Sequence, residues 1–369
     1  MAEIRLEHLQ KRFADFTAVR DTNLVVDDGC FFVLLGPSGC GKTTTLRMIA
    51  GLEQPSAGRI LLAGEDVTGR RAAQRDIAFV FQLFALYPHM NVRRNIGFPL
   101  KSQGVTRGEI RARVMEVARL LRIEHLLDSP VSRLGSGDRQ RVALGRAIVR
   151  RPKAFLMDEP LGTLDTEFRQ LMCDELRQLH DRIHATTVYV THDQVEAMSM
   201  GDRIAVMDGG VVLQTGTPGE IYDRPATRFV AAFIGSPPMN FLRIGQGAES
   251  GSEVLRINGA TLPIPRLQEA SSGPQVWFGV RPEHVVLGAD SGLRGEVFSV
   301  EYMGARQLVT LDTVAGRIKA RVPNNLSVAR GEQLSIAFRT ERVVVFDGLT
   351  SRALRSAANP LAGNGAGHG

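Results

Sequence analysis

Cysteine is scarce in this chain of 369 residues, which has only Cys30, Cys40 and Cys173. Three scattered cysteines exclude a disulfide framework and a zinc site built from paired ligands, so a reducing compartment fits best. The sequence also has one Trp and four Tyr and no dense run of Lys or Arg. This composition argues against nucleic acid as a partner.

Long apolar runs are missing as well. No stretch of about 18 uncharged apolar residues occurs, so we expect no membrane-spanning helix. The first residues lack the basic and apolar segments of a secretory signal, which predicts a chain that is not secreted. Apolar residues make up 43%, charged residues 23% and the net charge is +6. These values are typical of a globular protein, and the length favours two or three domains.

Short apolar strands alternate with helical stretches up to about residue 235. Strands are predicted at residues 31–35, 77–80, 154–157, 187–190 and 203–207, and a helix at 42–52. This alternation predicts an α/β nucleotide-binding domain over residues 1–235. Between about residues 91 and 150 the pattern is helical and strongly charged, which indicates an inserted helical subdomain.

After residue 235 the pattern changes to short strands separated by Gly, Pro and Asn. Strands are predicted at residues 276–280, 295–302, 306–311, 317–322, 334–338 and 343–346. Strands at this spacing predict a small all-β, OB-like barrel as an accessory domain over residues 236–350. Residues 351–369 are rich in Ala and Gly and are predicted to form a disordered tail.

A glycine-rich turn between the strand at 31–35 and the helix at 42–52 is the strongest motif. Gly36-Pro37-Ser38-Gly39-Cys40-Gly41-Lys42-Thr43 matches the phosphate-binding pattern G-x-x-x-x-G-K-S/T. Backbone amides in this turn and the helix dipole are predicted to bind the phosphates of ATP. Lys42 is expected to contact the β- and γ-phosphates and Thr43 to bind Mg²⁺. Thr44 completes the predicted nucleotide-binding set. The alternative without a binding function is a glycine turn before a structural helix.

The thiol of Cys40 lies at the start of this helix. A helix N-terminus tends to lower the pKa of a thiol. Oxidation of Cys40 would then block the phosphate site, but redox regulation is the disfavoured interpretation of this cysteine.

An acidic pair, Asp158-Glu159, follows the predicted strand at 154–157. An acidic pair after a strand is more often a helix start or a turn, but the phosphate-binding turn upstream reverses that balance. We therefore expect Asp158 to hold the Mg²⁺ shell and Glu159 to polarise the attacking water.

Further motifs occur in the order and at the spacing of the ATPase subunits of ABC transporters, which the chain resembles. The resemblance implies that Gln82 in Val80-Phe81-Gln82 bridges Mg²⁺ and the membrane partner. It implies that His192 in Val190-Thr191-His192-Asp193 holds the γ-phosphate and water, although a single histidine is more often structural. Asp165 in Leu164-Asp165 matches a family residue at the dimer seam. Phe13 matches the aromatic residue that stacks on adenine in the family, and Phe16 is the alternative for that role.

The family signature Leu-Ser-Gly-Gly-Gln is altered here to Leu134-Gly135-Ser136-Gly137-Asp138. In the family this segment contacts ATP held by the other chain of a dimer, which makes Gly135, Ser136 and Gly137 predicted nucleotide-binding residues. Gly135 removes a hydroxyl donor, and Asp138 brings a charge that repels phosphate but stabilises a helix start. A second departure is Gly162-Thr163, where this branch of the family commonly has Ser-Asn.

Three alternatives remain open for the altered signature. The chain is an active enzyme in which Ser136 replaces the missing hydroxyl, a slow enzyme, or the partner of a separate ATPase chain with an intact signature. Loss of a donor that works like an oxyanion-hole group costs about 10²- to 10³-fold in rate.

Two further segments resemble parts of an importer. Ala85-Leu86-Tyr87-Pro88-His89-Met90 is similar to the surface that docks transmembrane subunits. Residues 233–242 and Gly279-Val280-Arg281-Pro282-Glu283-His284 resemble the linker and accessory barrel of carbohydrate-importer ATPases, the maltose and glycerol-3-phosphate type. The resemblance covers about residues 3–348.

This resemblance implies a homodimeric, Mg²⁺-dependent ATPase at the cytoplasmic face of the membrane. Its partners would be permease subunits and, indirectly, an extracytoplasmic solute-binding protein. A polyamine or metal-ion importer is the alternative within the class, and a heterodimer with a related ATPase is the alternative assembly. A soluble ABC protein of repair or translation and a non-hydrolysing scaffold are the alternatives outside the class.

Overall fold

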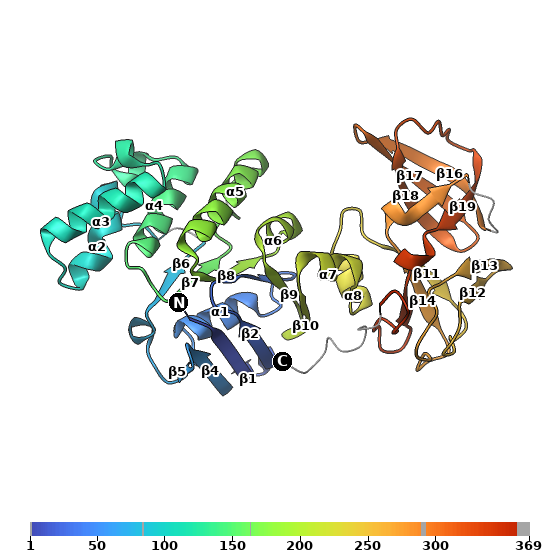
Figure 1. Cartoon of the computed structure of the whole chain (residues 1–369), viewed down its shortest axis with the longest axis horizontal. Helices are drawn as coiled ribbons and strands as arrows, with labels where there is room; N and C mark the ends of the chain where they lie inside the picture. The colour runs from blue at the N-terminus through green and yellow to red at the C-terminus, as the bar shows by residue number, and fades with distance from the viewer. Residues whose placement is uncertain (1, 83–84, 163, 289–292, 360–369) are drawn as a thin grey trace. The chain divides into compact units, whose positions relative to one another are not determined.

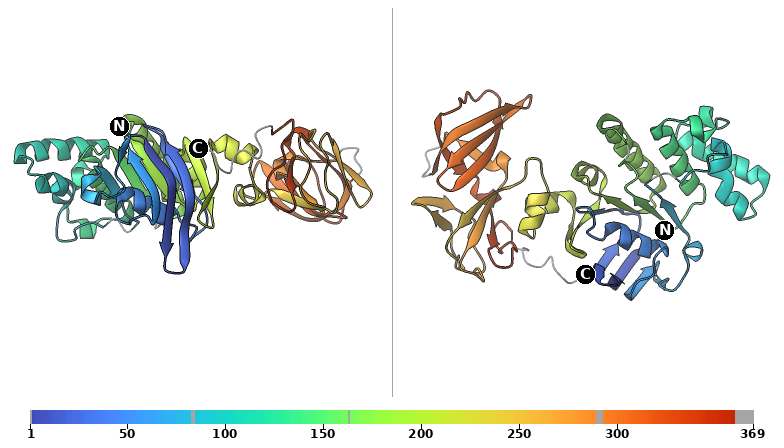
Figure 2. Two further views of the ribbon diagram at one scale, coloured as in Figure 1. Left: turned by 90° about the horizontal axis from the view of Figure 1, so that it is seen from below. Right: turned by 180° about the vertical axis from the view of Figure 1, so that it is seen from behind.

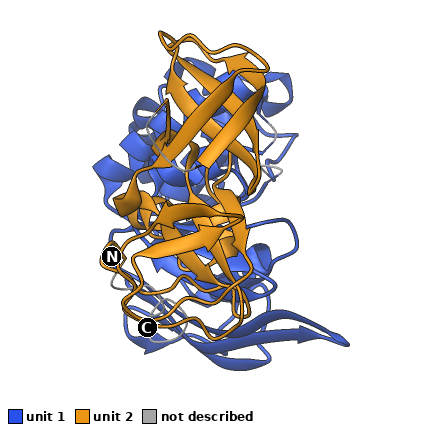
Figure 3. Ribbon diagram, turned by 90° about the vertical axis from the view of Figure 1, so that its right-hand side faces the viewer, with its two compact units in different colours: residues 1–218, 369 blue, residues 219–368 orange. Residues whose placement is uncertain are grey.

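The computed structural model describes residues 2–82, 85–162, 164–288 and 293–359 (Figure 1). The chain divides between Pro218 and Gly219 into two compact units, which we name unit 1 and unit 2 (Figure 3). Each unit has its own apolar core, as expected for separate domains. No helix in the described part of the chain is long and apolar enough to cross a membrane.

Unit 1 combines two sheets with six helices in its described residues. Its strands are β1 (Ile4–Phe13), β2 (Phe16–Val26), β3 (Phe31–Leu35), β4 (Ala57–Leu62), β5 (Glu65–Asp66), β6 (Ile77–Val80), β7 (Ala154–Asp158), β8 (Thr186–Thr191), β9 (Arg203–Asp208) and β10 (Val211–Gly216). Its helices are α1 (Lys42–Ala50), α2 (Val92–Ser102), α3 (Arg107–Leu120), α4 (Ser136–Ile148), α5 (Thr166–Ile183) and α6 (Gln194–Met200). Short 3₁₀ turns occupy Ala72–Gln74, Glu124–Leu126 and Val131–Arg133.

The central sheet of unit 1 has the strand order β10-β9-β3-β8-β7-β6 and is parallel except for the β9–β10 pair. A second, antiparallel sheet has the order β2-β1-β4-β5. All residues of β3, β7 and β8 are buried, because helices or the second sheet cover these strands. Since parallel strands end at one edge, the segments after β3, β7 and β8 are brought together there.

Helices α2, α3 and α4 pack against one another and lie at one end of unit 1, away from β1 and β2 (Figures 1 and 2). Side chains cap two of them: Asn91 accepts a hydrogen bond from the amide of Arg94, and Thr106 accepts one from Glu109. The predicted α/β core with an inserted helical subdomain is therefore confirmed.

Unit 2 is mostly β-structure. Its strands are β11 (Asn240–Ile244), β12 (Val254–Ile257), β13 (Ala260–Pro263), β14 (Val276–Val280), β15 (Val285–Leu287), β16 (Leu293–Tyr302), β17 (Arg306–Thr313), β18 (Gly316–Pro323), β19 (Gln333–Phe338) and β20 (Val344–Asp347). Helices α7 (Pro218–Asp223) and α8 (Arg228–Phe233) and 3₁₀ turns at Pro282–His284 and Thr340–Arg342 complete it. The sheets have the orders β11-β14-β20, β12-β13 and β15-β19-β16-β17-β18. They enclose a shared apolar core, which confirms the predicted all-β, barrel-like accessory domain.

Residues 351–359 differ from the disordered tail predicted from residue 351. Ala353 and Leu354 are buried, and their amides donate to the carbonyl oxygens of Ala226 and Val345 at 2.9 and 2.8 Å. The apolar side chains fix this segment to unit 2 in spite of its Ala-rich composition. Residues 360–369 of the predicted tail lie outside the described residues.

Arg281 anchors the two short helices α7 and α8 to the β-structure of unit 2. It is 2% exposed, and its guanidinium donates to the carbonyl oxygens of Tyr222 and Ile234 at 2.7 Å each. The guanidinium also lies 3.7 Å from the centre of the Tyr222 ring, and the Tyr222 hydroxyl donates to Glu283. These contacts place residues 219–235 with unit 2, whereas the sequence prediction put the boundary at residues 235 and 236.

Candidate nucleotide site

The turn between β3 and α1 has the conformation that its glycines permit. Gly39 and Gly41 have positive φ angles of 80° and 106°, which side chains disfavour. A Cβ on Gly36 would lie 2.2 Å from the carbonyl oxygen of Met207, so only glycine fits there. The turn leads directly into α1, whose first amides have no partner within the helix. This geometry is suited to binding an anionic phosphate.

Lys42 lies inside this turn and is almost fully buried. Its Nζ donates hydrogen bonds of 2.8 Å to the carbonyl oxygens of both Gly36 and Pro37. These bonds hold a positive charge beside the free amides, where phosphate oxygens would bind. Ser38 and Gly39 are exposed, and Thr44 is partly exposed on the first turn of α1.

Burial has the dominant effect on the pKa of the Cys40 thiol. The side chain is buried, and desolvation raises the pKa of the thiol, although nearby Lys42 lowers it. The expectation of a lowered pKa at the helix start is therefore wrong, because desolvation outweighs the helix and the lysine. A protonated, buried thiol is a poor target for oxidation.

Thr43 and Asp158 meet across the end of the central sheet. The Thr43 hydroxyl donates to Oδ1 of Asp158 at 2.8 Å. Asp158 is buried, and desolvation raises its pKa, while the bond from Thr43 opposes that shift. One hydroxyl and one carboxylate at a phosphate-binding turn fit Mg²⁺, which binds through few protein oxygens and keeps phosphates and waters as its other ligands.

Glu159 and His192 follow β7 and β8 and face each other. Oε2 of Glu159 lies 3.3 Å from Nδ1 of His192, and the Glu159 amide donates to the carbonyl oxygen of Val190 at 3.0 Å. Glu159 has a φ of 45°, a left-handed conformation that a glutamate adopts only at a cost. The His192 side chain is half exposed. Both groups are therefore accessible to a substrate at the sheet edge.

Gln82 lies close to the turn that follows Glu159. Its Nε2 is 3.7 Å from the position that a Cβ on Gly162 would take, and the Gly162 amide donates to the Glu159 carbonyl at 3.2 Å. The side chain is exposed, as expected for a group that binds ligands. The structure thus brings Gln82 to the same edge as Glu159. Thr163 of the altered Gly162-Thr163 pair lies outside the described residues.

Phe13 and Phe16 pair across the tip of the β1–β2 hairpin and are both exposed. The ammonium of Lys11 lies 4.7 Å from the centre of the Phe13 ring, which gives that ring a defined neighbour. Either ring is accessible for stacking.

Asp165 caps α5. Its Oδ1 accepts a hydrogen bond of 2.9 Å from the amide of Phe168, so the aspartate that resembles a dimer-seam residue also begins a helix.

The altered signature forms the start of α4. Gly135 is the N-cap with an extended backbone and no side-chain cap, and Ser136 is the first helical residue and is exposed. A Cβ on Gly137 would lie 2.1 Å from the ring of Phe168, so this glycine is required by packing. Asp138 is bound at 3.2 Å by Arg141, which also pairs with Glu175 at 2.9 Å. Because Arg141 serves two carboxylates, it offsets only part of the negative charge that Asp138 brings to the helix start.

Two buried charged residues support the site and were missed by the sequence analysis. Arg75 donates to the carbonyl oxygens of Met48 and Ile49 at 2.7 and 2.9 Å, which satisfies the end of the phosphate-binding helix α1. Glu196 accepts bonds from Tyr189 and Thr191 beside His192. A single Arg or Glu between structured segments is usually exposed to solvent. One sequence therefore gives no signal that Arg75 or Glu196 is buried.

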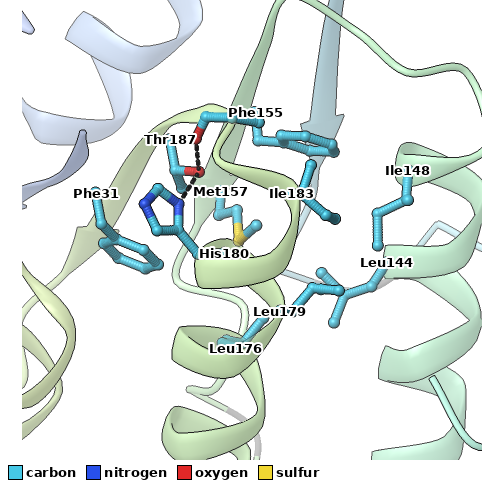
Figure 4. Close-up of a pocket in the computed structure, with 11 residues that line it drawn as sticks. Phe31, Leu144, Ile148, Phe155, Met157, Leu176, Leu179, His180, Ile183 and Thr187 are labelled. Atoms are coloured by element: carbon cyan, nitrogen blue, oxygen red, sulfur yellow. Dashed lines mark hydrogen bonds between the residues drawn. The ribbon is translucent and has the colours of Figure 1, made fainter. Parts of the chain in front are cut away.

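An apolar cavity lies elsewhere in unit 1, between α4, α5 and the central sheet (Figure 4). His180 lines it, with Nδ1 3.2 Å from the Thr187 hydroxyl, and burial lowers the pKa of this histidine. The other labelled side chains include Phe31, Leu144 and Phe155 (Figure 4). None of the predicted nucleotide-binding residues lines the cavity, so it is separate from the predicted nucleotide site.

Comparison with known proteins identifies the family. Over 94% of its length the chain is 46% identical to the trehalose import ATP-binding protein SugC of Mycobacterium tuberculosis, 97% of which is covered. The chain therefore belongs to the ATP-binding proteins of ABC transporters. It is also 46% identical to the trehalose/maltose import ATP-binding protein MalK of Thermococcus litoralis, over 96% of this chain and 100% of that one. With the sn-glycerol-3-phosphate import ATP-binding protein UgpC of Chromobacterium violaceum it shares 43% identity over 97% and 98% of the two chains.

Family models match both units of this ABC protein. Residues 19–162 match the ABC transporter model, residues 235–285 the MalK OB fold domain and residues 278–346 the TOBE domain. The predicted accessory barrel thus consists of two matched β-modules.

Solved structures support the same fold for unit 1. A bacterial ABC transporter cassette solved as a dimer is 29% identical with a TM-score of 0.53, over 58% of this chain and 98% of that one. CbiO1 from Clostridium perfringens, part of an ABC transporter complex, is 28% identical with a TM-score of 0.56. The match covers 59% of this chain and 89% of that one. The predicted family, fold class and ATPase activity are confirmed.

Proposed function

We propose that this chain is the ATP-hydrolysing subunit of an importer for a sugar or a glycerol-3-phosphate-like solute. The observation that carries the proposal is the meeting of the phosphate-binding turn, Asp158, Glu159 and His192 at one sheet edge. The MalK-type OB and TOBE modules of unit 2 and relatives named for trehalose, maltose and sn-glycerol-3-phosphate import support the solute class.

Each site residue has a defined role in this proposal. Phe13 stacks on adenine, while Lys42 and the amides of residues 36–44 bind the phosphates. Thr43, Asp158 and Gln82 would hold Mg²⁺, which shields phosphate charge when bound. Glu159 accepts the proton of the attacking water, and His192 donates a hydrogen bond to the γ-phosphate. Asp165 and the segment Gly135-Ser136-Gly137 contact the site of the partner chain.

Two copies of the chain would close on two ATP molecules and reopen after hydrolysis. We place this homodimer at the cytoplasmic face of the membrane, bound peripherally to permease subunits that receive solute from an extracytoplasmic binding protein. A polyamine or metal-ion importer is the second candidate, because the two-unit architecture alone does not specify the solute. A solute assay therefore decides between them.

Solute uptake by intact cells tests the proposal. Deleting the gene should abolish energy-dependent uptake of one solute among labelled trehalose, maltose and glycerol-3-phosphate. The wild-type chain should restore it, and Lys42→Ala should not, because the buried ammonium beside the phosphate-binding amides is lost. Unchanged uptake of all three together with loss of polyamine or metal-ion uptake would establish the second candidate instead.

Tyr87 is predicted to connect ATP turnover to transport. Its ring packs 4.6 Å from the ring of Phe98 and lies 5.5 Å from the Arg146 guanidinium, in the segment just after Gln82. An aromatic side chain at the centre of an interface is typically worth about 2 kcal/mol, or roughly 30-fold in affinity. Tyr87→Ala should therefore lower uptake by roughly that factor.

The matched control for this prediction is Tyr302→Ala, since Tyr302 is an exposed tyrosine of unit 2. ATP binding, measured with a fluorescent analogue, should stay within about threefold of wild type in both variants. Normal uptake by Tyr87→Ala would show that the permease docks elsewhere.

A further inference from the structure

Arg169 contacts two separate segments around the nucleotide site. It lies near the start of α5, and its Nη2 donates to the carbonyl oxygen of Leu164 at 2.9 Å. Its Nη1 donates to Oδ2 of Asp193 at 3.2 Å, and its Nε lies 3.7 Å from Oε1 of Glu196. One guanidinium thus joins the residue before Asp165 to the residue after His192.

The segment around His192 is fixed on both sides through this network. Glu196 is 4% exposed in its side chain and accepts hydrogen bonds from Tyr189 and Thr191 at 2.8 and 2.7 Å. Asp193 caps α6 by accepting from the amides of Val195 and Glu196 at 2.7 and 3.2 Å. His192 lies between Thr191 and Asp193, so its backbone position depends on these partners.

The segment around Asp165 is fixed in a similar way. Asp165 accepts a bond from the Phe168 amide, and the ring of Phe168 covers Gly137 of the altered signature. Arg169 follows Phe168 directly. The first turn of α5 therefore touches both the Asp165 segment and the start of α4.

We propose that Arg169 is a positioning residue that couples the two nucleotide sites of the dimer. This inference rests on the proposed function, in which Asp165 lies at the dimer seam and His192 contacts the γ-phosphate. A shift of His192 on phosphate loss would move Asp193, and the guanidinium would pass that shift to Leu164 and Asp165. Among the described residues the Arg169 Nε–H makes no hydrogen bond, so its contact with Glu196 has room to shorten during such a shift.

Arg177 provides a matched control on the same helix. Its Nη1 donates to the carbonyl oxygen of Met200 at 2.9 Å and to Oδ1 of Asp202 at 2.7 Å. Arg177 thus connects α5 to the far end of α6, with the same chemistry and a similar exposure. Among the described residues, its hydrogen bonds and ion pairs go to Met200, Asp202 and Asp181, and not to the Asp165 or His192 segment. Loss of Arg177 should lower stability without changing the coupling.

The test measures ATP turnover by the full-length chain over a range of ATP concentrations. Loss of about 1 kcal/mol of coupling in the transition state should lower the kcat of Arg169→Met by roughly fivefold, with KM for ATP within about threefold. The Hill coefficient for ATP, which lies between 1 and 2 for two coupled sites, should fall to about 1 in this variant. Asp193→Asn, which keeps a side-chain cap but loses the charge, should reproduce the loss of cooperativity. Arg177→Met should keep kcat within about twofold and the Hill coefficient of wild type.

A second readout separates coupling from chemistry. In a Glu159→Gln background, ATP-dependent dimer formation followed by light scattering should weaken with Arg169→Met and not with Arg177→Met. Equal effects of Arg169→Met and Arg177→Met, or an unchanged Hill coefficient in Asp193→Asn, would overturn the inference. If Arg169→Met does not fold, Arg169→Lys and Asp193→Asn carry the test. Full turnover by Glu159→Gln would instead refute the proposed residue roles.

Discussion

Replacing Glu159 by Gln is expected to reduce ATP turnover by about 10²- to 10⁴-fold, the range attributed to a general base. The amide has the shape of the carboxylate but cannot accept the proton of the attacking water. Because Glu159 contacts His192 and not the phosphate-binding turn in this structure, the affinity for ATP should stay within about threefold. Phosphate release and binding of a fluorescent nucleotide, measured on the same preparation, check both statements.

The control for this substitution is Glu167→Gln, an exposed glutamate in the first turn of α5. This variant removes the same charge from an exposed position and should leave ATP turnover within about twofold of wild type. A Glu159→Gln variant that keeps more than a tenth of wild-type turnover would mean that another group takes the proton. His192, 3.3 Å away, would then be the first candidate.

Ser136 is expected to supply the hydroxyl that Gly135 lacks. It is the exposed first residue of α4, and Cβ atoms at a helix start point toward the helix N-terminus, where the partner's phosphate would bind. Ser136→Ala should therefore lower turnover by about 10²- to 10³-fold, as for loss of an oxyanion-hole donor. The pairing of Asp138 with Arg141, which is shared with Glu175, removes part of the repulsion that opposes this arrangement.

Two comparisons distinguish the alternatives for the altered signature. The triple variant Gly135→Ser, Ser136→Gly and Asp138→Gln should have an ATP turnover within a few-fold of wild type. Ser132 is an exposed serine nearby, and Ser132→Ala should leave ATP turnover unchanged. If Ser136→Ala is silent and the triple variant is about a hundredfold faster, the natural chain is a slow motor. Native mass spectrometry that finds a second ATPase chain in the working complex would then favour the heterodimer.

The contiguous parts of the site could be predicted from the sequence. The phosphate-binding turn lies within eight residues, from Gly36 to Thr43, and Asp158 and Glu159 directly follow an apolar strand. Since parallel strands end at one edge, the sequence pattern was enough to bring Thr43 and Asp158 together, and the structure places them 2.8 Å apart. Local chemistry and strand direction carried this information.

Features that depend on distant contacts could not be predicted in the same way. The low-pKa expectation for Cys40 failed because burial, which only the fold reveals, raises the pKa. Arg75 and Arg169 look like surface residues until their carbonyl acceptors are known. By contrast, the β12–β13 hairpin did carry a local signal, since Asn258-Gly259 forms its turn with positive φ at both residues.

The Arg281 anchor limits how this protein can exchange parts with its relatives during evolution. A gene fusion at residue 235 would bring Arg281 from one parent and the Tyr222 and Ile234 carbonyl acceptors from another. Because these acceptors are backbone carbonyl oxygens, a mismatch arises where the other parent's residues 219–235 follow a different backbone path, and it then leaves a buried guanidinium without partners. Recombination after Pro218 keeps donor and acceptors together. Residues 219–235 and Arg281 are therefore expected to be inherited as one block across the family.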